Sequence, residues 1–242
     1  MAEAELTEVP RIGGWQEAEV TGIHSETARV KSLTLALPVI TPFLAGQHFL
    51  VRLTAPDGYR AQRSYSVGSA PSDGTSIELT VEKLPGGEVS EFLHDELQVG
   101  DMLEVRGPIG GWFVWDGTSP ALLIGGGSVV VPLMSMLRLA RREGSSRAHL
   151  IVSARTPEDL IYSGELESAD TTLVFTRAVR SGFPRPAGRL TVSDIEPHLS
   201  AGAGATVYVC GSTPFTDAAE DLARQAGASV ESIRVERFGP SG

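Results

Sequence analysis

Four consecutive residues, Arg63-Ser64-Tyr65-Ser66, combine a cation, an aromatic ring and two hydroxyl groups in a strand-like segment. On an extended chain, Arg63 and Tyr65 face one side and the two serines face the other. A cofactor lying along this strand would meet a guanidinium, an aromatic face and hydroxyl or backbone donors within a few residues. Taken alone, the tetrapeptide fits an ordinary edge strand with a stabilising arginine better than a cofactor site.

Two glycine-containing segments follow. In Leu84-Pro85-Gly86-Gly87-Glu88-Val89-Ser90, the glycines permit close approach of the backbone to a ligand. The start of the helix expected next presents free N–H groups to an anion. A turn followed by a helix cap explains the same residues. The third segment, Arg106-Gly107-Pro108-Ile109-Gly110-Gly111-Trp112-Phe113, is irregular and carries aromatic residues.

The elements that position these segments change character near residue 118. Before it, short β-branched or alternating runs are separated by Gly, Pro and Asp, which is typical of a small antiparallel barrel. One helix is expected there, at 89–97, because its apolar residues recur at helical spacing. The strands are expected at 18–23, 30–37, 49–53, 64–67, 77–81 and 102–105.

After residue 118 the chain alternates strands and helices, which predicts a doubly wound parallel sheet. We therefore expect a two-domain protein, with an antiparallel β-barrel at 1–117 and an α/β domain at 118–242. Strands are expected at 121–124, 149–154, 173–176, 206–210 and 233–236. Helices are expected at 132–142, from Thr156-Pro157, and from an N-cap at Thr213 to Gly227.

Composition excludes several classes of function. The 242 residues are 41% hydrophobic and 21% charged, as in a globular protein, and carry a net charge of −10, which argues against nucleic-acid or anionic-membrane binding. A single cysteine excludes a disulfide framework. The five histidines lack the spacing of metal ligands, so no metal site is expected. His94 and the other histidines are expected at the surface. Without an apolar run of membrane length or a signal peptide, a cytoplasmic location is expected.

In their order along the chain, these segments resemble the ferredoxin–NADP reductase superfamily. The resemblance continues through Gly125-Gly126-Gly127-Ser128, the helix that follows it, Ser153-Ala154-Arg155-Thr156, Tyr208-Val209-Cys210-Gly211 and Glu236-Arg237-Phe238-Gly239. It covers nearly the whole chain and implies that domain 1–117 binds a flavin and domain 118–242 binds NAD(P).

The resemblance assigns roles around the flavin. Arg63 would pair with its phosphate, Tyr65 would stack on its ring, and Ser66 would hydrogen-bond near the N5 edge that accepts hydride. The resemblance favours FAD as the bound flavin, and FMN stays open as an alternative. The remaining flavin-binding residues would be Ser64, with Val81 and Glu82 along the flavin and Gly87, Glu88, Val89 and Ser90 at the pyrophosphate.

The resemblance also assigns a nicotinamide nucleotide site. Thr176-Arg177 is similar to the pair of a hydroxyl residue and an arginine with which the family binds the adenosine 2′-phosphate. The second strand of the α/β domain ends in Ala154-Arg155, where an NAD-binding domain would carry an acidic residue that hydrogen-bonds to the ribose hydroxyl groups. NADPH is therefore favoured over NADH. The assigned residues are Gly126, Gly127 and Ser128 in the phosphate loop, Arg155, Thr176 and Arg177, Cys210 and Gly211 beside the nicotinamide, and Glu236 and Phe238 in the C-terminal segment by the flavin. From its spacing alone, without the resemblance, Cys210 is interpreted as a small buried thiol in the core.

Two valines depart from the family pattern, at positions 129 and 131. Val129 stands where relatives usually carry a glycine, and a β-branched residue disfavours positive φ and narrows the approach to a pyrophosphate. Either nucleotide affinity is reduced or the loop takes a different path. We expect Val129→Gly to tighten NAD(P)H binding.

The resemblance implies hydride transfer from the nicotinamide C4 to the flavin N5, with Tyr65, Ser66, Cys210 and Glu236 as the catalytic residues. A single cysteine cannot hold an iron–sulfur cluster, so electrons would pass to a separate acceptor such as a ferredoxin, an oxygenase component or a haem protein. Two alternatives stay open. One is a flavoprotein binding module or electron-transfer subunit with weak or no NAD(P)H oxidation, and the other is a flavin-free two-domain protein.

Overall fold

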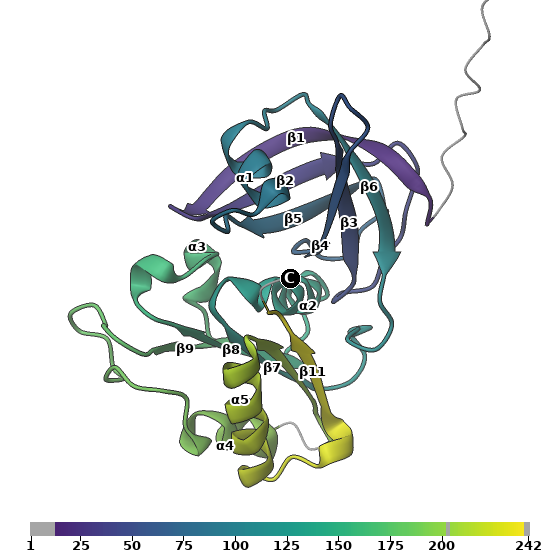
Figure 1. Cartoon of the computed structure of the whole chain (residues 1–242). Coiled ribbons are helices and arrows are strands. Elements are labelled where there is room, and N and C mark those ends of the chain that lie inside the picture. The colour runs from purple at the N-terminus through teal and green to yellow at the C-terminus, as the bar shows by residue number, and fades with distance from the viewer. Residues whose placement is uncertain (1–12, 202–203, 240–242) are drawn as a thin grey trace, which may run out of the picture.

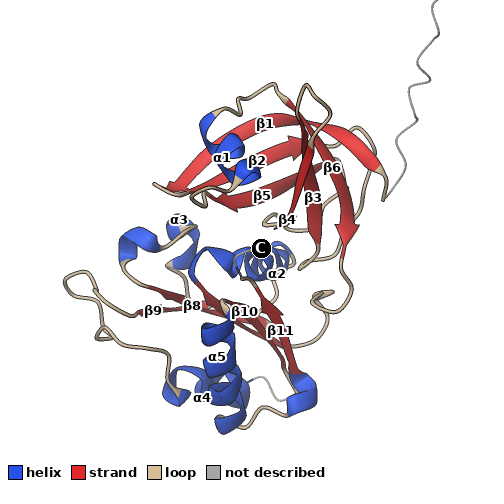
Figure 2. Ribbon diagram, in the orientation of Figure 1, coloured by secondary structure: helices blue, strands red, loops and turns tan. Residues whose placement is uncertain are grey.

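The computed structural model describes residues 13–201 and 204–239, which fold into two lobes (Figures 1 and 2). The first, called the barrel lobe, contains six strands and one helix. Its elements are β1 (Trp15–Thr27), β2 (Val30–Ala36), β3 (His48–Thr54), β4 (Arg60–Ser66), β5 (Ser76–Glu82), α1 (Glu88–Asp95) and β6 (Met102–Ile109).

The second, called the sheet lobe, contains the remaining strands and helices. Its strands are β7 (Ala121–Gly126), β8 (Ala148–Ala154), β9 (Thr171–Phe175), β10 (Thr206–Gly211) and β11 (Ile233–Arg237). Its α-helices are α2 (Val131–Arg142), α3 (Ser163–Leu166), α4 (Val192–Ala201) and α5 (Thr213–Gln225), and its 3₁₀ turns are η1 (Gly127–Val130), η2 (Pro157–Asp159) and η3 (Val230–Ser232).

The six strands of the barrel lobe pair in the order β4-β3-β6-β1-β2-β5, and every described pairing is antiparallel. A bridge between Val67 and Leu79 joins the two edges and closes the barrel. Alternate residues point inward, as in β1, where Ala18 and Val20 are buried and their neighbours Glu17 and Glu19 are exposed. This period of two is the pattern that predicted the strands.

The sheet lobe has five parallel strands in the order β11-β10-β7-β8-β9. In Figure 1, α2 lies between this sheet and the barrel, while α4 and α5 lie on the opposite side of the sheet. The strand order reverses between β7 and β10, and in such sheets a ligand binds at the carboxyl ends of the strands beside that reversal. The predicted fold class, an antiparallel barrel followed by a doubly wound parallel sheet, is confirmed.

Four local predictions were wrong or incomplete. The helix expected from Thr156-Pro157 is a single 3₁₀ turn, η2, after which the chain becomes extended at Leu160. The N-cap of α5 is Ser212 instead of Thr213. Helix α4 was not predicted. His94 is buried instead of exposed, because its ring Nε2 lies 2.9 Å from the carbonyl oxygen of Val81.

The segment around the expected domain boundary is packed against the sheet lobe. Trp115 is 2% exposed, and its indole N–H donates to the carbonyl oxygen of Ser119 over 3.0 Å. The division at 117/118 stays a prediction. No helix within the described residues is long and apolar enough to cross a membrane.

Candidate functional site

Strand β4 presents the residues expected to meet the flavin. The Arg63 side chain is exposed, and its one described hydrogen bond runs to the carbonyl oxygen of the neighbouring Gln62, so within the described chain this cation has no acidic partner. Tyr65 is half-buried against the barrel core, and this burial raises the pKa of its phenol, so the hydroxyl stays protonated. Ser64 is exposed and Ser66 is buried.

The start of α1 has no side-chain cap, although Glu88 and Glu91 make its first turn acidic. Gly87 is the N-cap and no side chain caps the helix, so the first N–H groups, from Glu88 and Val89, lack intrahelical acceptors. The preceding Gly86 has a φ of 74°, a left-handed conformation that favours glycine. Ser90 has a structural role beside its expected contact with a pyrophosphate. Its hydroxyl accepts from the Leu84 N–H over 3.2 Å and donates to the Gly87 carbonyl over 3.1 Å, so it shapes the turn.

Strand β5 contributes the backbone of Val81 and the side chain of Glu82 to the candidate site. The Val81 side chain is fully buried in the barrel core, so Val81 can meet a ligand through its backbone only. Glu82 is half-buried and accepts a hydrogen bond from the Ser128 hydroxyl, and Arg29 lies 3.3 Å from its other oxygen. The Glu82–Ser128 contact brings the proposed phosphate loop of the sheet lobe directly against the barrel.

The glycine loop connects β7 to α2 through η1. The left-handed position is Gly127, with a φ of 71°, and among the described non-glycine residues only Tyr162 has a positive φ. Val129 is therefore in a conformation that valine adopts readily, which agrees with the second expected alternative, a different path of the loop. The loop takes a 3₁₀ path that assigns the left-handed turn to Gly127.

The Phe215 ring of α5 packs so closely that two positions of the site, 126 and 211, must be glycine. A Cβ atom at Gly126 would lie 2.8 Å from the Phe215 ring, and one at Gly211 would lie 2.4 Å from it. These glycines end the neighbouring strands β7 and β10, so both allow the ring to pack at the point where the strand order reverses. Their close packing is a structural role beside any ligand contact.

Cys210 and Glu236 lie opposite each other on β10 and β11. The thiol is fully buried and lies 2.8 Å from the carbonyl oxygen of Val129, to which it donates. Burial, followed by the nearby Glu236 carboxylate, raises the pKa of the Cys210 thiol well above its ordinary value. The thiol is therefore a proton-bearing donor and not a nucleophile at neutral pH.

Glu236 carries an orphaned atom. Its Oε2 is buried without a hydrogen-bond partner, and no other side-chain nitrogen or oxygen of residues 13–201 and 204–239 is in that state. Burial raises the pKa of this carboxyl from its ordinary value of 4.5 to about 7. A partly buried carboxyl with one unpaired oxygen and a pKa near neutral pH is typical of functional sites, because burying a charge without a partner is costly.

The carboxyl ends of β8 and β9 bring two arginines together. The Arg177 N–H donates to the Arg155 carbonyl oxygen over 2.9 Å, and Thr176 pairs in the same way with Ala154. The side chains of Arg155 and Arg177 are exposed and have no described acidic partner. Two arginines that follow in sequence, Arg180 and Arg185, are already paired, with Glu167 and Asp194 respectively.

The candidate residues thus form two groups that face each other across the lobes. The sheet-lobe group lies along the carboxyl edge of its sheet, and Phe238 closes it by donating its N–H to the Gly211 carbonyl over 3.0 Å. The barrel-lobe group comprises the end of β4, β5 and the start of α1. Among the described residues, no hydrogen bond joins Tyr65 or Ser66 to Cys210 or Glu236, so the protein leaves the two groups unlinked at this point.

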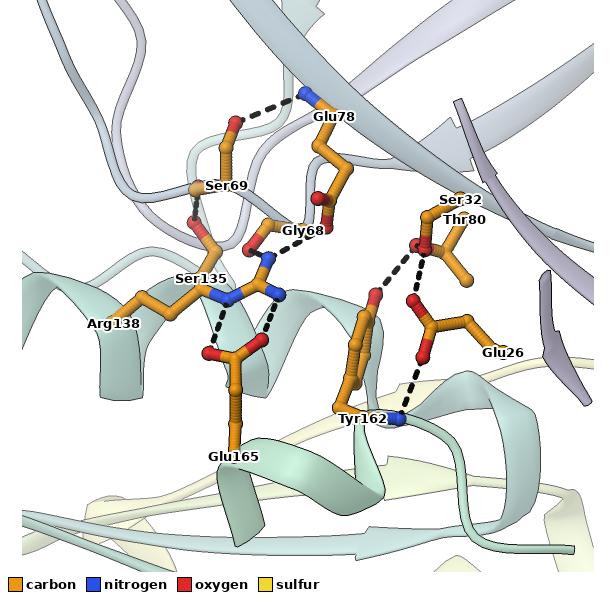
Figure 3. A network of polar contacts seen from close by, with 10 residues as sticks. All are labelled: Glu26, Ser32, Gly68, Ser69, Glu78, Thr80, Ser135, Arg138, Tyr162 and Glu165. Carbon is orange, nitrogen blue, oxygen red and sulfur yellow. Dashed lines mark hydrogen bonds and ion pairs between the residues drawn. The ribbon is translucent and has the colours of Figure 1, made fainter. Parts of the chain in front are cut away.

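Sequence reasoning missed the residues that hold the lobes together. Ser135 and Arg138, on the barrel-facing side of α2, and Tyr162, before α3, contact the barrel through buried or part-buried hydrogen bonds (Figure 3). The spacing of Ser135 and Arg138, three residues apart on a mostly apolar helix, was an available signal. Tyr162 carried no signal in the sequence.

Two family descriptions match the chain. The one described as an oxidoreductase FAD-binding domain matches residues 17–114, and the one described as an oxidoreductase NAD-binding domain matches residues 123–221. The two matches coincide with the barrel lobe and with most of the sheet lobe.

Similar proteins are longer than this chain. The glycine betaine monooxygenase reductase subunit of Chromohalobacter salexigens is 34% identical over 84% of the chain and 58% of its own length. The propane 2-monooxygenase reductase component of Rhodococcus jostii is 31% identical over 90% of the chain and 62% of its own length. The chain therefore spans about 60% of these relatives.

Solved structures agree in fold. The FAD/NAD-binding domain of a nitric oxide dioxygenase from Vibrio cholerae superposes with a TM-score of 0.78 at 20% identity, covering 95% of this chain and all of that one. A cytochrome P450 reductase from Amycolatopsis superposes with a TM-score of 0.76 at 25% identity, covering 94% of this chain and 71% of that one.

Proposed function

Because the chain belongs to the ferredoxin–NADP reductase superfamily, with an FAD-binding domain followed by an NAD-binding domain, we propose that it is an FAD-containing reductase that oxidises NAD(P)H and passes the electrons to a separate acceptor. In this proposal residues 1–117 bind FAD and residues 118–242 bind the nicotinamide nucleotide. A cytoplasmic location stays a prediction from the sequence.

The observation that carries the proposal is the orphaned Glu236 Oε2 at the carboxyl edge of the sheet, beside Cys210. The barrel lobe fits an anionic ligand as well, since Arg63 has no acidic partner and the start of α1 is uncapped. Arg63, the α1 N–H groups and the Tyr65 ring would hold FAD, and Ser66 would meet its reactive edge. When bound, FAD supplies the capacity to take two electrons with a hydride and release them singly.

The chain's own residues would orient the reaction and control protons. The Tyr65 ring, wedged against the barrel core, is a rigid stacking surface. Glu236, at a pKa of about 7, can hold or release a proton at its free Oε2, and Cys210 keeps its thiol proton directed at Val129. Phe238, half-buried and anchored to Gly211, helps to exclude water from the same edge.

We propose NADPH as the preferred donor, supported by the two unpaired arginines, Arg155 and Arg177. Replacing Arg177 by Ala is expected to raise the KM for NADPH about 10- to 100-fold while changing that for NADH little, because a charge-assisted hydrogen bond contributes roughly 1.5–3 kcal/mol. Steady-state kinetics with both nucleotides measure this. Arg180→Ala is the matched control, since Arg180 is already paired with Glu167. Equal changes for both nucleotides in the Arg177 variant would contradict the assignment.

Val129 is expected to limit nucleotide affinity by crowding the loop, although not by backbone strain. Val129→Gly should lower the NADPH dissociation constant severalfold, at a cost in stability of about 1 kcal/mol from added chain freedom. Equilibrium titration of the FAD-loaded protein with NADP⁺ or NADPH measures the constant. An unchanged or weaker affinity would count against the crowding.

For the acceptor we propose an oxygenase component, by analogy with the two monooxygenase reductases that this chain resembles. The test is NADPH-dependent reduction of a one-electron acceptor such as ferricyanide by the purified, FAD-loaded protein. Turnover is expected. A protein that binds FAD yet reduces no acceptor and leaves NADPH unoxidised would favour the alternative, a flavoprotein binding module.

A further inference from the structure

A network of polar contacts, buried around Tyr162 and more exposed towards Glu165, joins the barrel lobe to the sheet lobe, separate from the proposed cofactor residues (Figure 3). The barrel lobe contributes residues from β1, β2, β5 and the turn after β4, and the sheet lobe contributes residues from α2, the start of α3 and the residue before it. We call this set the interlobe network. Its members are Glu26, Ser32, Gly68, Ser69, Glu78, Thr80, Ser135, Arg138, Tyr162 and Glu165.

The first branch of the network is a closed ring around Tyr162. The Tyr162 N–H donates to Glu26 Oε2 over 2.9 Å, and the Ser32 hydroxyl donates to Glu26 Oε1 over 2.7 Å. A hydroxyl has one proton, and Ser32 donates its proton to Glu26, so in the 2.9 Å contact between Ser32 and Thr80 the donor must be Thr80. In the 2.5 Å contact between Thr80 and Tyr162, the donor must then be the Tyr162 hydroxyl. Every hydroxyl in the ring has one defined donor role, so the ring fixes one arrangement.

The second branch centres on Arg138 of α2. Its guanidinium donates to the Gly68 carbonyl over 2.9 Å and to Glu78 over 2.5 Å, and it grips Glu165 through two hydrogen bonds of 3.0 and 2.5 Å. One turn earlier, the Ser135 hydroxyl donates to the Ser69 carbonyl over 2.7 Å. The guanidinium lies 4.8 Å from the centre of the Tyr162 ring, which links the two branches.

Two backbone features show how closely the lobes are matched here. Tyr162 is 3% exposed and has a φ of 56°, a left-handed conformation that a bulky residue adopts only where its surroundings require it. At Gly68, a Cβ atom would lie 2.9 Å from the Tyr162 hydroxyl oxygen and 3.0 Å from Glu78 Oε1. The contact therefore needs a glycine on one side and a strained tyrosine on the other.

The anchor points adjoin the residues assigned to the cofactors. Gly68 follows Ser66 by two residues, and Thr80 directly precedes Val81 on β5. On the other side, Ser135 and Arg138 belong to the helix that follows the Gly126–Ser128 loop. A rotation of one lobe against the other would break these contacts and would also move the two halves of the proposed site apart.

We propose that the interlobe network is a positioning device that sets the distance and angle between the flavin-binding and nicotinamide-binding residues, with Tyr162 and Arg138 as its positioning residues. This inference rests on the proposed function. Neither residue belongs to the proposed cofactor site. Each acts by holding α2 and the segment before α3 against the ends of β4 and β5, so that the reacting rings meet at a productive separation.

The test compares Tyr162→Phe and Thr80→Val with matched controls. Tyr208→Phe also removes a buried tyrosine hydrogen bond, from its hydroxyl to the Val114 carbonyl, and Thr216→Val removes a buried threonine hydroxyl bonded within its own helix. The rate of FAD bleaching at saturating NADPH is measured under anaerobic conditions, together with the dissociation constants of FAD and NADPH.

In the two network variants we expect bleaching about tenfold slower, with both dissociation constants within about twofold of the parent, since a displacement of about 1 Å can cost up to 100-fold. The double variant should be no slower than Thr80→Val, because Thr80→Val already removes the hydrogen bond that Tyr162→Phe removes, together with the bond from Thr80 to Ser32. Arg138→Lys should be faster than Arg138→Met, which leaves Glu78 and Glu165 facing each other without a cation. Bleaching in Tyr162→Phe and Thr80→Val as fast as in the controls would overturn the proposal.

Hydrogen exchange supplies a readout that does not depend on turnover. Amides of the 68–80 segment and of residues 160–166 should exchange faster in Tyr162→Phe than in Tyr208→Phe, in both the FAD-loaded protein and the apoprotein. Equal exchange would again overturn the inference. If the parent protein were not bleached by NADPH at all, the proposed function would fail, and the exchange comparison alone would decide whether the network holds the lobes.

Discussion

Replacing Glu236 by Gln is expected to slow the reduction of bound FAD by NADPH about 100-fold while making the protein more stable above pH 7. The kinetic loss is of the size expected when a positioned acid–base group is removed. The Gln side chain has nearly the same shape as Glu but can neither release a proton nor carry a charge beside Cys210. A large loss therefore reports on the chemistry of the carboxyl and not on packing.

The stability gain follows from the direction of the pKa shift. Burial raises the pKa of Glu236 from 4.5 to about 7, so between these values the folded protein binds a proton that the unfolded chain releases. Stability therefore falls as the pH rises through this window, and the full cost is present above pH 7. The Gln side chain does not titrate, so the Glu236→Gln variant should lack this decline and gain up to about 3 kcal/mol above pH 7.

Rapid-mixing kinetics and denaturant unfolding, each repeated from pH 5 to pH 9, measure the two effects. The parent's rate profile should have an inflection near pH 7 that is absent in the Gln variant. Glu231→Gln is the matched control, because Glu231 is exposed and precedes the same strand. A Glu236→Gln protein that matches the parent in rate at every pH would remove Glu236 from the catalytic residues.

Replacing Arg63 by Ala is expected to weaken FAD binding about 10- to 100-fold. The guanidinium has no acidic partner in the described chain, so its loss breaks no ion pair within the protein. A charge-assisted hydrogen bond to a phosphate contributes roughly 1.5–3 kcal/mol, and each 1.4 kcal/mol changes the dissociation constant about tenfold. The expected loss is therefore a direct measure of a ligand contact.

Calorimetric titration of the apoprotein with FAD measures this effect. Arg60→Ala is the matched control, since Arg60 is exposed on the same strand but outside the proposed site. The parent's affinity should also fall more steeply with added salt than that of Arg63→Ala, because one charge pair is missing in the variant. FAD affinities that agree between Arg63→Ala and Arg60→Ala would exclude Arg63 as a phosphate contact.

Most of the fold was predictable because local patterns and tertiary structure agree. Where they disagree, the tertiary contacts decide. Thr156 and Asp159 form a capping box, yet only the 3₁₀ turn η2 follows, because the chain becomes extended at Leu160 and buries Ile161 and Tyr162. Conversely, α4 was not predicted, because it contains Pro197 and a proline inside a helix is unfavourable. Thr191 and Asp194, which hydrogen-bond to each other at its start, were an available capping signal in the sequence.

The candidate site was predictable as a set of segments but not as a set of interactions. Gly126 and Gly211 suggested ligand contacts, which stay a prediction, and the structure adds that both accommodate the Phe215 ring, which a sequence cannot reveal. Val129 suggested either a reduced nucleotide affinity or a different path of the loop, and the structure shows a path in which Gly127 takes the left-handed turn. The left-handed Tyr162 could not be anticipated, because its conformation is set by Glu26 and Thr80, more than 80 residues away in sequence.

The central claim is that FAD and NADPH meet between the two lobes, and anaerobic titration of the FAD-loaded protein with NADPH tests it most directly. We expect the visible flavin absorption to bleach completely with one equivalent of NADPH, and faster than with NADH at the same concentration. A protein that takes up FAD but keeps its full colour in excess NADPH and NADH would contradict the account.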